Sequence, residues 1–173
     1  MNDWAIRGER PEDAAAIRRV TEAAFAGHPH SEGTEPAIID RLRADGDLAL
    51  SLVAEADSEI IGHAAFSPTI LSGGQDGWYS LGPISVLPER QGQGIGRALI
   101  EVAVAHWRNA GAQGLVVLGD PDLYGRFGFL RGAPLHLRGP LAGYFQVLPF
   151  TADIPDSAVG FAPAFGWTGG EDS

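Results

Sequence analysis

The chain contains no cysteine and no lysine. The absence of cysteine excludes disulfides, thiolate metal sites and a cysteine nucleophile, and it fits a reducing, cytoplasmic compartment. The absence of lysine excludes a phosphate loop of the type Gly-x-x-x-x-Gly-Lys-Ser/Thr. No stretch approaches the ~18 uninterrupted apolar residues of a membrane span. The first residues, Met1–Trp4, lack a basic region followed by an apolar run, so we expect no signal peptide.

Positive charge is also scarce: the chain has 12 basic and 22 acidic residues, which gives a net charge of −10. This balance argues against nucleic acid as a partner, since phosphate neutralisation needs clusters of Lys and Arg. It favours a cationic substrate such as an amine, although solubility alone accounts for it equally well. A length of 173 residues with 45% hydrophobic content predicts one domain over residues 1–173, with an irregular tail at 151–173.

The segment around three alternating glycines organises the rest of the chain. An apolar, β-rich run at 78–86 predicts a strand, which Pro88 ends because proline has no N–H to donate. Residues 97–110 predict an amphipathic helix with a polar stripe at helical spacing. Gly92, Gly94 and Gly96 therefore fall where a helix begins.

A helix start of this kind is suited to binding an anion. The first turn has four amide groups without intrahelical partners, and the helix dipole adds partial positive charge there. Glycine lets a phosphate or pyrophosphate approach the backbone closely. The alternative is a flexible loop capped by glycine, but three alternating glycines exceed what a turn requires. A dinucleotide fingerprint is excluded by spacing, because its third glycine would fall at Arg97.

The remaining pattern predicts a mixed α/β fold. We expect strands at 4–7, 48–55, 59–70, 78–87, 115–119, 135–137 and 144–148, and helices that begin at Pro11, Thr34 and Asp120 in addition to 97–110. Because a helix connects the strands at 78–87 and 115–119, these two should be parallel. His28 and His30 flank a proline, but no third ligand is evident nearby, so we predict a solvated loop and no metal site.

Two motifs carry a resemblance to a known family. Gln91-x-x-Gly94-x-Gly96 resembles the acyl-CoA pyrophosphate loop, [Q/R]-x-x-G-x-[G/A], of the GNAT superfamily of N-acyltransferases. Tyr124-x-x-x-Gly128-Phe129 resembles the Y-x-x-x-G-F that follows the fifth strand in many of these enzymes. The amino-acid sequence of residues 81–88 and 118–121 is similar to that of the bacterial YhbS-like subgroup.

The resemblance implies a GNAT fold: a mixed sheet of about seven strands with a V-shaped splay between strands 4 and 5, flanked by about four helices. It implies acetyl-CoA as co-substrate, with pantetheine against the backbone of Ile84 and Val86. The residues expected to bind the pyrophosphate are Gln91, Gly92, Gln93, Gly94, Ile95, Gly96 and Arg97. Arg90, Arg97 or Arg126 could neutralise CoA phosphates, with a solvated surface arginine as the equal alternative for each.

The chemistry implied is transfer of an acetyl group to a primary amine by direct attack in a ternary complex. Tyr124 is the candidate donor of a proton to the leaving thiolate, against the alternative of a core tyrosine. The general base that would remove the amine proton is not identified. Residues 78–86 contain no carboxylate and offer Ser80 and Ser85 instead. The other candidates are Glu32, Glu35, His63 and a water chain. His63, with apolar neighbours, is expected to be a core residue.

Two other functions compete with this one. A non-catalytic acyl-CoA sensor would keep the glycine loop and lack turnover, and the missing base favours it. A nucleotide-dependent dehydrogenase would use Asp120 after a strand, but the glycine spacing opposes it, and Asp120 is explained as a helix cap. The acceptor is left open as a small-molecule or peptide amine, bound near the 27–33 loop and the tail; no membrane partner is expected, and a homodimer is a further expectation.

Overall fold

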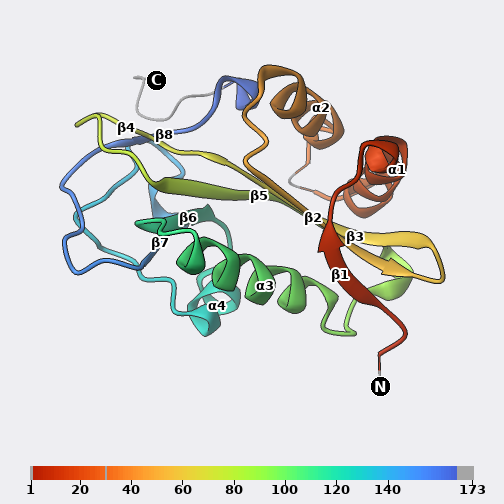
Figure 1. The fold of residues 1–173 in the computed structure, drawn as a ribbon. Helices are drawn as coiled ribbons and strands as arrows, with labels where there is room; N and C mark the ends of the chain where they lie inside the picture. Colours follow the sequence, from red (N-terminus) through yellow and green to blue (C-terminus); the bar gives the residue numbers. More distant parts are fainter. Residues whose placement is uncertain (1, 30, 167–173) are drawn as a thin grey trace. The chain divides into compact units, whose positions relative to one another are not determined.

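The computed structural model describes residues 2–29 and 31–166 (Figure 1). His30 and the end of the predicted tail, 167–173, lie outside these ranges. The strands are β1 (Ala5–Gly8), β2 (Leu50–Ala56), β3 (Glu59–Pro68), β4 (Ile70–Leu71), β5 (Trp78–Val86), β6 (Gly114–Leu118), β7 (Phe145–Pro149) and β8 (Val159–Gly160). The α-helices are α1 (Ala14–Phe25), α2 (Glu35–Asp45), α3 (Ile95–Asn109) and α4 (Pro121–Tyr124), with short 3-10 turns between several of these elements.

The main sheet has six strands in the order β1-β2-β3-β5-β6-β7, and β4 and β8 form a separate two-stranded sheet. The predicted mixed sheet with four helices is confirmed, with six strands in place of about seven. The predicted strand at 135–137 is wrong: this segment makes only an isolated bridge between His136 and Ala158. Pro134 and Pro140 on either side cannot donate a ladder hydrogen bond, which keeps the segment from extending into a strand.

The chain divides into two compact units, which we describe separately. The first unit comprises Met1–Phe66 and Gly82–Val104. In it β2 pairs antiparallel with β1 and with β3, and the β2–β3 hairpin turns at Asp57 and Ser58, both with positive φ as a tight hairpin turn requires. Its core cluster is apolar and comes from α1, α2, β2 and β3: Ile17, Val20, Ile39, Val53, Ile60 and Ala65.

The second unit comprises Ser67–Leu81 and Ala105–Ser173. In it β5 pairs parallel with β6, as the crossover helix predicts, and β6 pairs antiparallel with β7. The β5–β6 register ends with Ser80 opposite Val116, although β6 continues to Leu118. The core cluster of this unit is built from both of its sheets: Leu71, Trp78, Val116, Leu135, Leu137, Phe145, Val147, Val159 and Phe161.

Two helix caps predicted from the sequence behave differently. Asp120 caps α4 as predicted, because its carboxylate accepts the amide hydrogen of Asp122 at 2.9 Å and its backbone is extended. Thr34 holds the corresponding position before α2, but its side chain makes no capping bond. Its backbone is already helical, with φ −90° and ψ −13°, and a capping side chain requires an extended backbone there.

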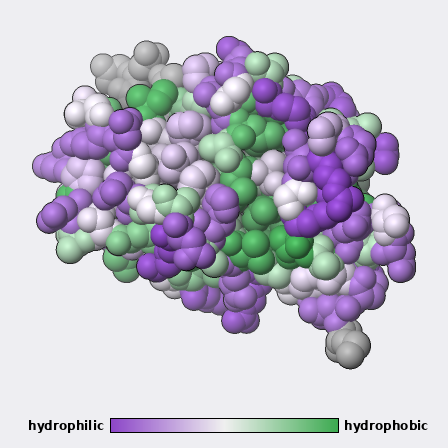
Figure 2. Space-filling model, in the orientation of Figure 1, coloured by the Kyte–Doolittle hydropathy of each residue, from purple (hydrophilic) through white to green (hydrophobic). Residues whose placement is uncertain are grey.

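Hydrophilic residues cover much of the face drawn in Figure 2, and hydrophobic residues gather near its middle. The hydrophilic margin agrees with the excess of acidic residues in the sequence. Within the described ranges, every helix is too short or too polar to span a bilayer.

Candidate functional site

The glycine loop joins the end of β5 to the start of α3 in the first unit. A 3-10 turn at Pro88–Arg90 leads into it, and α3 begins at Ile95. Gly92 and Gly94 have φ of +79° and +84°. Residues with a Cβ rarely adopt this left-handed conformation, so glycine is favoured at both positions. The loop thus turns tightly just before the helix, as the sequence predicts.

The first turn of α3 offers backbone amides. The amide of Ala98 donates to the carbonyl of Gly94 at 3.0 Å, so the amides of residues 95–97 precede the first intrahelical bond. Gln93 and Gly94 are exposed, whereas the side chain of Ile95 is buried. Ile95 can therefore contribute only its backbone to a ligand. Backbone amides at an exposed helix N-terminus can donate to a phosphate or another anion.

The side chain of Gln91 fixes the loop to the strand before it. Its Nε2 donates to the carbonyl of Val86 at 3.2 Å, and the amide of Leu87 donates to the carbonyl of Ile61 at 2.9 Å. The first bond ties the loop to the end of β5, and the second ties the residue after β5 to β3. The Val86 carbonyl keeps a second lone pair, and Ile84 and Val86 are half-buried, so this strand end can still pair with a ligand amide.

The two arginines beside the loop already have acidic partners. Arg90 donates to Asp3 at 2.9 Å, and Arg97 donates to Glu101 one helical turn later at 2.7 Å. The Arg97 side chain is 76% exposed, so this pair contributes little stability and its arginine can be redirected to a ligand. Arg126 is exposed on the second unit.

Tyr124 ends α4 in the second unit. It is 6% exposed, and the edge of its ring packs against Phe129 with centroids 5.8 Å apart. Burial raises the pKa of the Tyr124 phenol above its ordinary value of 10.0. The phenol is therefore protonated at neutral pH, which is the state a proton donor needs.

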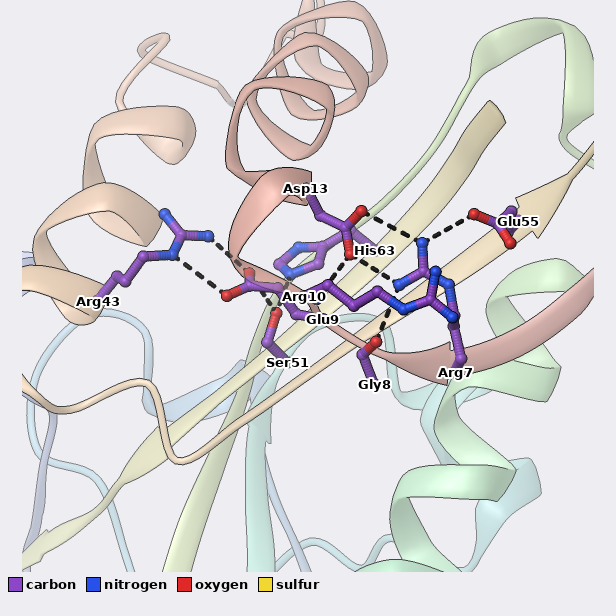
Figure 3. A network of polar contacts seen from close by, with 9 residues as sticks. All are labelled: Arg7, Gly8, Glu9, Arg10, Asp13, Arg43, Ser51, Glu55 and His63. Atoms are coloured by element: carbon purple, nitrogen blue, oxygen red, sulfur yellow. Dashed lines mark hydrogen bonds and ion pairs between the residues drawn. The ribbon is translucent and has the colours of Figure 1, made fainter. Parts of the chain in front are cut away.

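His63 is the fully buried member of a polar network whose other members are partly exposed (Figure 3). Its Nε2 is 2.7 Å from the Ser51 hydroxyl, which is 2.9 Å from Oε1 of Glu9, and Arg43 donates to the same oxygen of Glu9 at 2.6 Å. His63 has no exposed surface, and burial lowers its pKa from 6.5 to about 4. It is neutral at physiological pH and enclosed by protein, in agreement with the core role that its apolar neighbours suggest.

A second ion-paired group lies on the other side of the same network. Arg7 donates to Asp13 at 2.7 Å and to Glu55 at 2.8 Å, which joins β1, the 3-10 turn before α1, and β2. The hydrogen bond from Arg7 holds the pKa of Asp13 below its ordinary value. For Glu9, burial would raise the pKa, but the hydrogen bonds from Arg43 and Ser51 lower it overall. Both carboxylates are therefore charged at neutral pH.

The other candidate bases lie in two places, around the start of α2 and on β5. Glu32 is exposed, and Glu35 accepts a hydrogen bond from Ser31 at 2.6 Å at the start of α2. The hydroxyls of Ser80 and Thr69 are hydrogen-bonded, with their oxygens 2.6 Å apart, while the buried Ser85 hydroxyl has no hydrogen-bond partner among the described residues. Among those residues, no group of three or more His, Asp or Glu side chains is placed to hold a metal ion.

A pocket of about 350 Å³ lies at the loop between α1 and α2. Its walls include two carboxylates, those of Glu22 and Glu35, and two rings, those of Phe25 and His28, which meet edge to face at 6.2 Å. The pocket belongs entirely to the first unit. Its acidic walls suit a cationic group better than an anion.

Comparison with known proteins identifies the family. Residues 47–131 match the model of the acetyltransferase (GNAT) domain, a range that includes the glycine loop and Tyr124. The uncharacterized N-acetyltransferase YhbS of Escherichia coli K12 is 37% identical over 134 residues, which is 77% of either chain. The chain belongs to the GNAT acetyltransferase family.

Solved structures of GNAT proteins agree with the fold. A GNAT acetyltransferase of Brucella melitensis, crystallised with acetyl-CoA, is 50% identical, covers 94% of this chain and 97% of its own, and superposes with a TM-score of 0.83. The YhbS crystal structure of Escherichia coli, in complex with CoA, is 32% identical over 94% of this chain and 92% of its own, with a TM-score of 0.85.

The buried state of His63 predicts a pH dependence of stability. The folded pKa of about 4 lies below the unfolded value of 6.5, so the unfolded chain binds more protons between these pH values. The contribution of His63 is fully present above pH 6.5 and is lost as the pH falls toward 4. It should amount to about 2 kcal/mol between pH 7 and pH 5. Urea unfolding at the two pH values measures it.

The variant His63→Gln should remove most of this difference. His136→Gln, which changes an exposed histidine, serves as the control and should retain it. The carboxylates of Glu9 and Asp13 contribute mainly below pH 4.5, because their folded pKa values are lowered. An equal pH difference in wild type and His63→Gln would show that His63 is not the buried neutral group described.

Proposed function

We propose that this protein transfers the acetyl group of acetyl-CoA to a primary amine by direct attack within a ternary complex. The amine nitrogen attacks the thioester carbonyl, a C–N bond forms, and the C–S bond breaks. The amine proton passes to water and the sulfur receives a proton, so the products are an amide and CoA. The observation that carries the proposal is the glycine loop at the start of α3, in a chain that is 50% identical to an acetyltransferase crystallised with acetyl-CoA.

The CoA pyrophosphate would bind to backbone amides from Gln91 to Arg97. The residues involved are Gln91, Gly92, Gln93, Gly94, Ile95, Gly96 and Arg97. The first-turn amides of α3 supply hydrogen-bond donors, and the helix dipole favours the negative charge. The exposed Arg97 adds a positive charge once it exchanges Glu101 for phosphate.

The pantetheine arm would pair with the backbone of β5 near Ile84 and Val86. Amide groups of pantetheine can join a strand end in the same way as a peptide strand. A backbone N–H near Val86 would donate to the oxyanion that forms when the amine attacks the carbonyl. Specificity for CoA then comes from this strand, since any nucleotide phosphate could bind to the loop.

Tyr124 would donate the proton that the leaving thiolate needs, and its phenolate would then take a proton back from water. A thiol ordinarily titrates near 8.5, so its thiolate is a poorer leaving group than the protonated sulfur. The raised pKa of Tyr124 keeps the phenol protonated across the physiological range. We assign no side chain as the base, and water carries the amine proton away in this proposal.

The first prediction concerns ligand specificity and is tested by thermal unfolding. Acetyl-CoA and desulfo-CoA should both raise the Tm by about 5–10 °C at 100 times their Kd, because most of their contacts precede the sulfur. NAD and ATP at the same concentration should shift it far less, since they lack pantetheine. Stabilisation by NAD but by neither CoA compound would overturn the acyltransferase proposal.

The second prediction concerns Gly94→Glu. A carboxylate would then occupy the position proposed for the pyrophosphate, and calorimetry should detect no binding of acetyl-CoA. The positive φ of Gly94 also costs the fold about 1–2 kcal/mol when a side chain is added. Gly74→Glu is the matched control, because Gly74 has φ +78° and open space but lies in the β4–β5 turn.

The control should lose similar stability and keep wild-type affinity for acetyl-CoA. Wild-type affinity in a folded Gly94→Glu variant would remove the loop from the binding site. Lost binding in both variants would show that strain and not the position of the carboxylate is responsible.

The third prediction concerns Tyr124→Phe. It should lower kcat by about 10²–10⁴-fold and leave the affinity for acetyl-CoA nearly unchanged, because it removes only the proton donor. Hydroxylamine is a suitable acceptor, since it is mostly unprotonated at neutral pH and needs no general base. Released thiol is measured over pH 6–10 at saturating hydroxylamine and acetyl-CoA.

An unchanged kcat in Tyr124→Phe would make Tyr124 a core residue. A wild-type protein that binds acetyl-CoA but turns over neither hydroxylamine nor a panel of primary amines would favour the sensor alternative, which the missing carboxylate on β5 supports.

A further inference from the structure

Gly119 is the residue between the end of β6 and the Asp120 cap of α4, and the ring of Tyr124 lies against it. A Cβ added at Gly119 would meet Cε2 of Tyr124 at 2.3 Å, Cδ2 at 2.9 Å and Cζ at 3.4 Å. Cβ atoms essentially never come closer than 3.0 Å to heavy atoms of non-neighbouring residues. Gly119 does not have the positive φ that explains many glycines of this chain, so the ring itself explains this glycine.

The backbone of Gly119 is held in place on both sides. Its amide donates to the carbonyl of Tyr144 at 3.1 Å, and its carbonyl accepts from Nε2 of Gln146 at 3.0 Å. Gln146 is 1% exposed and its Nε2 also lies 3.3 Å from the Tyr144 carbonyl. Moving Gly119 away from the ring would break these partly buried hydrogen bonds, one of which satisfies the buried side chain of Gln146.

The backbone that carries Tyr124 is also fixed, so a clash with Gly119 has to be relieved by the ring. The amide of Tyr124 donates to the carbonyl of Asp120 at 3.0 Å, and Asp120 caps the helix through its side chain. Phe129 packs against the ring with a centroid distance of 5.8 Å. A new side chain at Gly119 would therefore displace the ring edge that leads to the hydroxyl.

We propose that Gly119 is a positioning residue for the reaction and sets where the phenol of Tyr124 donates its proton. This inference rests on the proposed role of Tyr124. Cε2 is bonded to Cζ, the carbon that carries the hydroxyl, so a shift at Cε2 moves the hydroxyl with it. Relief of a 2.3 Å contact to an ordinary 3.4 Å requires a movement of about 1 Å, and a misplacement of about 1 Å costs up to 10²-fold in rate.

The test compares Gly119→Ala with the matched control Gly125→Ala. Gly125 follows Tyr124, has φ −56° and has nothing within 4 Å of an added Cβ. With acetyl-CoA and hydroxylamine at saturation, Gly119→Ala should lower kcat by about 10- to 100-fold. KM for acetyl-CoA should change little, and Gly125→Ala should match wild type in both constants.

Two further readouts separate positioning from general damage to the fold. In the Tyr124→Phe background, adding Gly119→Ala should leave kcat unchanged, since the hydroxyl that it displaces is already absent. Burial raises the pKa of the phenol above 10.0, so Tyr124 stays protonated over pH 6–10 and the pH–kcat profile of Gly119→Ala should keep the wild-type shape at a lower kcat throughout.

The contrary outcomes are distinct. A wild-type kcat in folded Gly119→Ala beside a lowered kcat in Tyr124→Phe would overturn the positioning role alone. A wild-type kcat in Tyr124→Phe would overturn the proton donor and, with it, this inference. An equal loss of kcat from Gly119→Ala in the presence and absence of the hydroxyl would also contradict it.

If Gly119→Ala does not fold, a second pair of variants tests the clash. Tyr124→Ala removes the ring, so Gly119→Ala added to it should fold with the same Tm as Tyr124→Ala alone. A lower Tm in the double variant would show that Gly119 is required for a reason other than the ring, and would overturn the inference.

Discussion

The first turn of a helix cannot satisfy its own amides, and the start of α3 is built around that constraint. The loop before it turns through two glycines with positive φ, and Gln91 ties the loop to the carbonyl of Val86. Ile95 is 1% exposed, which fixes the first residue of the helix in the core. The amides of residues 95–97 are therefore held at the surface in a fixed direction, ready for an anion.

Partly buried charge is the second constraint of the first unit. The network in Figure 3 brings Glu9, Arg43, Ser51 and His63 together from four places in the sequence. Each charged member has a partner of opposite sign, and His63 avoids charge altogether through its lowered pKa. The network therefore ties α2 to the residue after β1 and to β2 and β3.

Local patterns in the sequence predicted most of the elements and the glycine loop. The parallel β5–β6 pair followed from the intervening helix, and the Asp120 cap followed from residue type. Pairings between distant short segments could not be predicted: β4 and β8 have two residues each and lie far apart in the chain. The network around His63 was missed for the same reason, since no spacing links Glu9, Arg43 and Ser51. Gly119 carried a weak signal, a glycine directly after an apolar strand, but only the ring of Tyr124 explains it.

In the proposed complex, the glycine loop would recognise phosphate through its backbone amides. The Gln91 side chain donates to the Val86 carbonyl, Ile95 is buried, and Arg90 is paired with Asp3. The loop therefore presents backbone amides and the exposed side chains of Gln93 and Arg97. Backbone amides bind any phosphate of suitable shape, whether it comes from a nucleotide or from CoA. A preference for one of these ligands therefore has to arise outside the loop. The half-buried end of β5, with Ile84 and Val86, is the part of the first unit that can supply it, because a strand end selects for a ligand that carries amides of its own.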